Sequence, residues 1–152
     1  MNLARKPNRR TTTAVLALLT AAALGTADGS AGASDTVTAP RQSKLIASSV
    51  LGSDYKIKLT ALRSSQDEYA ASVRLQVYTQ TADGAWKESD RVTVGEADGW
   101  FWFPLTGKVA VCEFSTASTE PAPLTVSLLV TPSIGCSEPA HYVVKQGRVL
   151  AS

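Results

Sequence analysis

Residues 55–61 read Tyr-Lys-Ile-Lys-Leu-Thr-Ala (YKIKLTA), and apolar and polar side chains alternate along the whole stretch. Successive side chains of a β-strand point to opposite faces, so this period of two predicts a strand with one apolar face. Residues 73–77 (VRLQV) alternate in the same way, as do residues 124–130 (LTVSLLV) except at Leu129. Strands of this kind are typical of antiparallel sheets that cover a core on one side.

Turn-forming residues separate these segments. Asp83-Gly84 predicts a hairpin between a strand that ends near Gln80 and one that begins near Trp86. Gln146-Gly147 predicts a second hairpin that pairs residues 141–145 with residues 148–151. Residues 45–51 are interpreted as a further strand. About eight short strands at this spacing predict an all-β fold, namely a small antiparallel β-sandwich, with a small β-barrel as the alternative.

The N-terminal third has the three-part layout of a secretory signal peptide. Four basic residues between Arg5 and Arg10 precede an apolar run of eleven residues, and small residues then lead to Ala33. We therefore predict a signal peptide over residues 1–33, with an earlier cleavage site near Ala27 as the alternative. The apolar run is much shorter than the roughly 20 residues that cross a bilayer, so we expect a secreted, extracellular protein without a membrane anchor.

Cleavage at this position changes the charge of the chain. The full chain has 15 Lys plus Arg against 13 Asp plus Glu, but residues 34–152 keep 11 basic and 12 acidic residues. A nucleic-acid-binding protein needs a basic stripe to displace counterions from phosphates, so we expect no nucleic-acid partner. Lys56 and Lys58 are interpreted as part of a solvated strand face. We predict a flexible lead-in over residues 34–43 and a single β domain over residues 44–152.

The chain contains two cysteines, Cys112 and Cys136. In a secreted protein a disulfide is the simplest interpretation of such a pair. A thiol nucleophile would need a neighbouring base, and His141 is the sole histidine. A structural zinc site needs about four ligands, more than these residues supply. The sequence therefore predicts one disulfide and no metal or other cofactor.

The run Trp100-Phe101-Trp102-Phe103 is the sharpest local feature. In a strand, the two tryptophans point to one face and the two phenylalanines to the other, so one pair enters the core and the other faces outward. The outward pair has three interpretations: burial under a loop, a platform that stacks on sugar rings, or a protein interface. For the platform, the candidate ligand-binding residues are Trp100, Trp102, Glu96 and Asp98.

No catalytic motif is recognisable. The chain has neither a G-x-S-x-G elbow nor a phosphate-binding loop, and no pair of carboxylates is placed as in a glycosidase. His141 with Glu138 nearby is the weak remaining candidate. We therefore predict a protein that is not an enzyme.

Two strings, Asp98–Phe103 (DGWFWF) and Leu129–Cys136 (LVTPSIGC), resemble small secreted proteins of filamentous actinobacteria. That group has no assigned activity, so the resemblance implies secretion and a one-domain product and assigns no functional residue.

Two functional hypotheses follow. The first is an extracellular binding module for a polysaccharide or a cell-surface component that uses Trp100 and Trp102. The second is a secreted inhibitor or partner of an extracellular protein such as a hydrolase, with the loop Thr131–Pro139 as the candidate contact segment.

Overall fold

The computed structural model describes residues 41–152. The predicted signal peptide and most of the predicted lead-in lie outside the described residues. Strand β1 begins at Ser43, one residue before the predicted start of the domain. No helix among residues 41–152 is long and apolar enough to cross a membrane.

The described part of the chain forms ten strands and one short helix. In chain order these are β1 (Ser43–Leu51), β2 (Tyr55–Arg63), β3 (Ala70–Gln80), β4 (Trp86–Val94), β5 (Trp100–Phe101), α1 (Trp102–Thr106), β6 (Val111–Thr116), β7 (Ala122–Thr131), β8 (Gly135–Cys136), β9 (Ala140–Lys145) and β10 (Arg148–Ala151).

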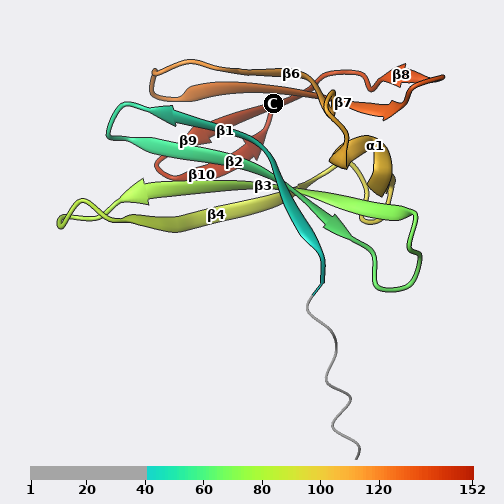
Figure 1. Ribbon diagram of the computed structural model, residues 1–152. Coiled ribbons are helices and arrows are strands. Elements are labelled where there is room, and N and C mark those ends of the chain that lie inside the picture. The colour runs from blue at the N-terminus through green and yellow to red at the C-terminus, as the bar shows by residue number, and fades with distance from the viewer. Residues whose placement is uncertain (1–40) are drawn as a thin grey trace, which may run out of the picture. The chain divides into compact units, whose positions relative to one another are not determined.

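The strands form two antiparallel sheets. The first sheet has the order β1-β2-β3-β4, with β5 added to the end of β3, and the second has the order β10-β9-β7-β6, with β8 paired to β7. Figure 1 shows β6, β7 and β8 of the second sheet above β2, β3 and β4 of the first, with α1 at one end between them. The predicted all-β sandwich is confirmed, and the sheets do not close into a barrel.

The core consists of the apolar side chains that the alternating pattern sends to one face of each sheet. Burial of each such side chain stabilises the fold by roughly 1.5–3 kcal/mol. The first sheet contributes Ile57, Leu59, Val73, Leu75 and Val77, and the second contributes Leu124, Val126, Leu128 and Val144.

Polar contacts join the two sheets at both edges. At one edge the hydroxyl groups of Ser49 and Thr116 lie 3.2 Å apart. At the other, the Ser89 hydroxyl on β4 donates to the Gly147 carbonyl at 2.8 Å, and the Val149 amide on β10 donates to the Asp90 carboxylate at 2.9 Å. These contacts fix the stacking of the sheets where apolar contact ends.

Both predicted hairpins are present. The strands on either side of Asp83-Gly84 end at Gln80 and begin at Trp86, as expected. The turn at Gln146-Gly147 pairs Lys145 with Arg148. Gly147 has a φ of 74°, and a Cβ there would lie 3.0 Å from Thr79 Cγ2, so only glycine fits this turn without strain.

The predicted disulfide is present. Cys112 on β6 is bonded to Cys136 on β8, with a Cα–Cα distance of 6.1 Å. Both strands pair with β7, so the bond lies within one sheet rather than between the sheets. It holds β8, a strand of two residues that has few backbone hydrogen bonds of its own.

Candidate functional site

The aromatic run changes from strand to helix in its middle. Trp100 and Phe101 form β5, opposite Ala71 and Ala70 of β3. Helix α1 then begins at Trp102, so the prediction of one continuous strand to Phe103 is wrong after Phe101. The physical reason is Pro104, which lacks the amide that a strand pairing uses. It fits the first turn of a helix, where amides have no partner within the helix.

The two tryptophans face inward. Both are half-buried and pack against the hydrophobic core. The Trp100 indole donates its Nε1–H to the Val94 carbonyl at 2.8 Å. Gly95, with a φ of 70°, lies against the same ring, where a Cβ would come within 3.3 Å of Nε1. The polar group and part of the ring surface of Trp100 are therefore used inside the protein.

Trp102 is held from two sides. Its amide donates to the Tyr69 carbonyl at 2.8 Å, which ties the start of α1 to the loop after β2. The Arg63 guanidinium lies 5.7 Å from the centre of the Trp102 ring and 5.7 Å from that of Phe103. Arg63 itself donates to the Glu68 carbonyl at 2.8 Å. The cation thus lies over the indole ring.

Asp98 has a structural role in its loop. With a φ of 56°, it accepts hydrogen bonds of 3.1 Å from the hydroxyls of Ser64 and Ser72, and its amide donates to Ser72 at 2.8 Å. Glu96 is exposed, and its carbonyl accepts the Gly99 amide at 3.2 Å. The four candidate ligand-binding residues therefore lie in one region, but they do not form an open aromatic platform, and their binding role stays a prediction.

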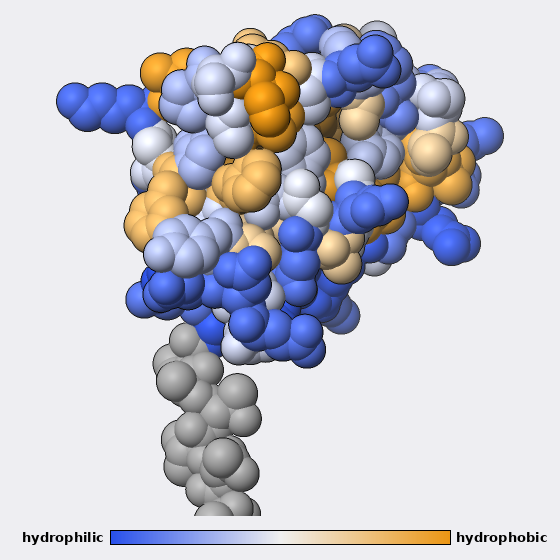
Figure 2. All heavy atoms as spheres, turned by 90° about the vertical axis from the view of Figure 1, so that its right-hand side faces the viewer, coloured by the Kyte–Doolittle hydropathy of each residue, from blue (hydrophilic) through white to orange (hydrophobic). Residues whose placement is uncertain are grey.

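The exposed rings of the run are the phenylalanines. Phe101 is 45% exposed and Phe103 56%, and Tyr69 at 59%, Val109 at 66% and Ile134 at 70% are also exposed. The Tyr69 and Phe103 ring centroids are 6.0 Å apart. We call these five residues the end surface. Figure 2 views this end of the molecule and shows apolar groups of side chains set among hydrophilic ones. Exposed apolar groups gathered in this way often mark an interaction site.

A shallow groove of about 450 Å³ lies next to Phe103 and Val109 of the end surface. Its lining is apolar apart from the ammonium group of a single lysine, and it comes from α1, the segment after it and the end of β7. The side chains concerned are Phe103, Pro104, Lys108, Val109, Leu129 and Pro132.

The fold brings the helix of the aromatic run next to the predicted contact loop. Pro132 belongs to Thr131–Pro139, the segment that the sequence indicated as a candidate contact loop, and it lines the same groove as Phe103. The sequence analysis did not identify Lys108 and Val109 as candidate contact residues. They lie in the segment between α1 and β6, where a single valine shows no periodic pattern. The disulfide at Cys136 and the buried Leu105 of α1 hold the two walls of the groove in place.

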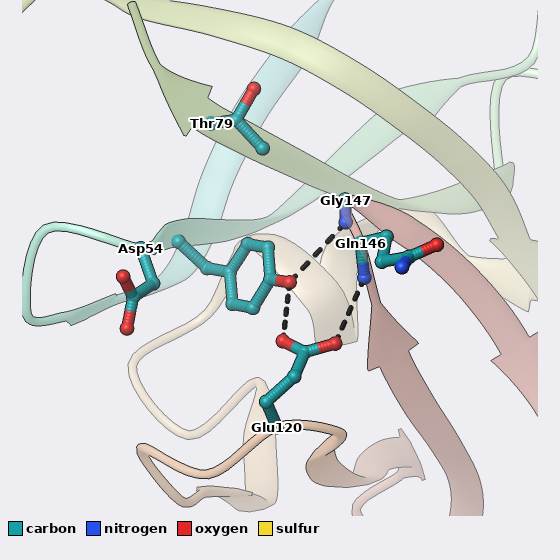
Figure 3. Close-up of a pocket in the computed structure, with 6 residues that line it drawn as sticks. Asp54, Thr79, Glu120, Gln146 and Gly147 are labelled. Carbon is teal, nitrogen blue, oxygen red and sulfur yellow. Dashed lines mark hydrogen bonds between the residues drawn. The ribbon is translucent and has the colours of Figure 1, made fainter.

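A second cavity, of about 370 Å³, is lined by residues that hydrogen-bond to one another (Figure 3). The Tyr55 hydroxyl donates to Glu120 Oε2 at 2.6 Å and accepts the Gly147 amide at 3.3 Å, and the Gln146 amide donates to Glu120 Oε1 at 3.0 Å. The hydrogen bond from Tyr55 lowers the pKa of Glu120. These hydrogen bonds join β2 of the first sheet to the segment before β7 and to the β9–β10 turn, so the cluster forms a junction between the two sheets.

His141, the weak catalytic candidate, has a threonine hydroxyl as its described hydrogen-bond partner. His141 Nδ1 lies 3.2 Å from the Thr125 hydroxyl on the neighbouring strand. Both cysteines are bonded to each other and supply no thiol. Among residues 41–152, no three His, Cys, Asp or Glu side chains gather as metal ligands would.

Comparisons of the chain with protein-family models, with curated proteins and with solved structures give no match. The functional inference therefore rests on the chemistry of the surfaces themselves.

Proposed function

We propose that this protein is a secreted, non-enzymatic binding protein that docks an extracellular protein, such as a hydrolase, on its end surface. The leader layout of residues 1–33 supports export. The disulfide supports an oxidising compartment, because such bonds persist mainly outside the cytosol.

The observation that carries the proposal is the group of exposed rings beside an apolar groove. Phe101, Phe103 and Tyr69 expose about half of their surface to water, although aromatic side chains dominate interface energetics when they are covered. A partner side chain that enters the groove would contact Phe103, Val109 and Pro132 at once.

The end surface is rigid, which favours binding. Lys44 of β1 donates a hydrogen bond to the carbonyl of Thr106, the last residue of α1. Leu105 anchors the same helix in the core, and the disulfide braces the far wall. A preformed surface loses little conformational entropy on binding.

A protein partner fits this groove better than a polysaccharide does. Sugar recognition needs several hydrogen-bonding groups around an open ring, but the groove is apolar apart from Lys108. The indole N–H of Trp100 already donates its hydrogen bond to the Val94 carbonyl. Polysaccharide binding through Trp100 and Trp102 would have to use the part of each half-buried ring that the protein leaves open.

The test begins with the purified mature protein and the culture fluid of its source. A stoichiometric complex should be isolated, its partner identified by mass spectrometry, and the affinity measured again with the purified partner by calorimetry. Val109→Asp places a charge in the groove and should weaken the complex at least about tenfold, since about 1.4 kcal/mol corresponds to that factor. Val50→Asp is the matched control, because Val50 is 56% exposed on β1, away from the groove.

The proposal fails if both variants bind the partner equally well. It also fails if the only specific interaction found is retention on an insoluble polysaccharide that Trp100→Ala removes. An activity of the purified protein that depends on His141 or Glu138 would overturn its non-enzymatic part.

A further inference from the structure

The outward face of the first sheet carries an ordered layer of polar side chains. The strand register places them in three rows across β2, β3 and β4: Lys56–Tyr78–Glu88, Lys58–Gln76–Arg91 and Thr60–Arg74–Thr93. We call these nine residues the polar face. Strands lie about 4.8 Å apart and alternate residues about 7 Å apart, so the polar face spans roughly 10 by 14 Å.

Hydrogen bonds fix the centre of the polar face. Gln76 Oε1 accepts the Thr60 hydroxyl at 2.9 Å, and Gln76 Nε2 donates to Glu88 Oε2 at 2.7 Å and to the Tyr78 hydroxyl at 3.1 Å. Glu88 Oε1 pairs with Arg91 Nε at 2.6 Å. The side chains are therefore held in place before any ligand arrives, which lowers the entropy lost on binding.

The polar face carries a net charge of +3, from Lys56, Lys58, Arg74 and Arg91 against Glu88. Residues 34–152 as a whole carry one more acidic than basic residue, so positive charge is concentrated here. Within residues 41–152 the ion pairs are Arg63–Glu68 and Arg91–Glu88, so three of the four cations on the polar face have no ion-pair partner there.

Next to these cations lie aromatic rings. The Lys58 ammonium lies 5.0 Å above the centre of the Tyr78 ring. Trp86 is two residues from Glu88 on β4 and opposite Gln80, so the strand alternation sends its half-buried ring to the same side. Rings at the rim of a flat polar surface can stack on the apolar faces of sugars.

We propose that the polar face binds an acidic polysaccharide, a chain of sugars that carry carboxylates. The carboxylates would pair with Lys56, Lys58 and Arg74, because ammonium and guanidinium groups form their strongest hydrogen bonds with such anions. Sugar hydroxyls would donate to Glu88 and bond with the Thr93 hydroxyl. This site is separate from the end surface, so one molecule would hold a polymer and a protein partner at the same time.

A polysaccharide fits this face better than a nucleic acid. The Glu88 carboxylate, at a corner of the polar face beside Gln76, accepts hydrogen bonds from hydroxyls, and it repels the closely spaced phosphates of a nucleic acid more than a polymer with one carboxylate per sugar. The Asp98 carboxylate, bound to Ser72 just beyond Arg74, adds a second negative charge at one end.

Affinity electrophoresis or calorimetry with soluble polygalacturonate tests the proposal, with neutral dextran and single-stranded DNA as further probes. The double variant Lys58→Gln, Arg74→Gln should weaken binding to polygalacturonate about tenfold. The matched control Lys145→Gln, Arg148→Gln removes the same two kinds of charge at the β9–β10 turn and should change binding less than about twofold. A rise from about 50 to about 500 mM NaCl should weaken binding further, because the contacts are exposed ion pairs.

Three results would overturn the proposal: no binding to polygalacturonate, equal losses in both double variants, or tighter binding to single-stranded DNA at the same salt concentration. Circular dichroism and the thermal midpoint confirm that each variant is folded. Neither variant touches the groove, so failure here leaves the protein-docking proposal open to its own test.

Discussion

Replacement of Trp100 by Ala separates a core role from a surface role within the aromatic run. Complete burial makes Trp→Ala substitutions cost about 3–5 kcal/mol, and a half-buried ring is expected to cost about half of that. Loss of the hydrogen bond to the Val94 carbonyl adds about 1 kcal/mol. The expected loss of unfolding free energy is therefore about 3 kcal/mol, out of a total of about 5–15 kcal/mol for a typical domain.

Phe103→Ala is the matched substitution on the exposed side of the run. Phe103 is 56% exposed, so its removal is expected to cost about 1 kcal/mol or less. Unfolding is monitored by far-ultraviolet circular dichroism, in urea for the free energy and on heating for the thermal midpoint. Fluorescence is not used, because removal of a tryptophan changes the signal itself. Trp100→Ala should lower the thermal midpoint by roughly 10–20 °C and Phe103→Ala by only a few degrees. Equal losses, or a stable Trp100→Ala protein, would refute the inward placement of the indole and return Trp100 to the list of ligand contacts.

Three further predictions concern the loops and turns. Replacement of Cys112 and Cys136 by Ala should reduce stability by roughly 3–4 kcal/mol on the chain-entropy model for a separation of 24 residues, as measured by denaturation with and without reductant. Hydrogen bonding lowers the pKa of Glu120 in the folded state below its ordinary value of 4.5. The ionised Glu120 therefore stabilises the fold fully above pH 4.5, and this stabilisation is lost as the pH falls through the lower pKa of the folded state. Glu120→Gln should therefore be less stable than the parent at neutral pH, and the gap should close in acid unfolding titrations. Gly147→Ala should be clearly more destabilising than Gly52→Ala. Both positions have a positive φ, but only a Cβ at position 147 would meet neighbouring atoms. Equal losses of the thermal midpoint in the two variants would contradict this reasoning.

Alternation along the chain predicted much of the sandwich. The segments at 55–61, 73–77 and 124–130 are strands, because a half-buried antiparallel strand must show its two faces in its residue order, and residues 45–51, interpreted as a strand without such alternation, belong to β1. The turns at Gly84 and Gly147 were predictable because few residues accept a positive φ. Strand β6 was missed: its sequence, VCEFST, has no clear alternation, and its pairing depends on β7.

The aromatic run shows what a local sequence pattern can predict and what it cannot. Strand alternation was sufficient to separate Trp100 from Phe101, because neighbouring side chains in a strand point in opposite directions, but the separation of Trp102 from Phe103 arises in helix α1. Alternation was not sufficient to show which pair is covered, since that depends on Arg63, Gly95 and Tyr69, which reach the run from other elements.

By itself, then, the sequence determined the fold class, the disulfide and the main turns, because each depends on residue periodicity, on cysteine count or on a local backbone preference. Tertiary structure alone decided the two candidate surfaces. The groove exists because α1, Val109 and the end of β7 meet, and the polar face exists because the register aligns cations from three strands. Contacts between residues far apart in the chain leave no periodic mark in it, so such surfaces become visible only once the strands are paired.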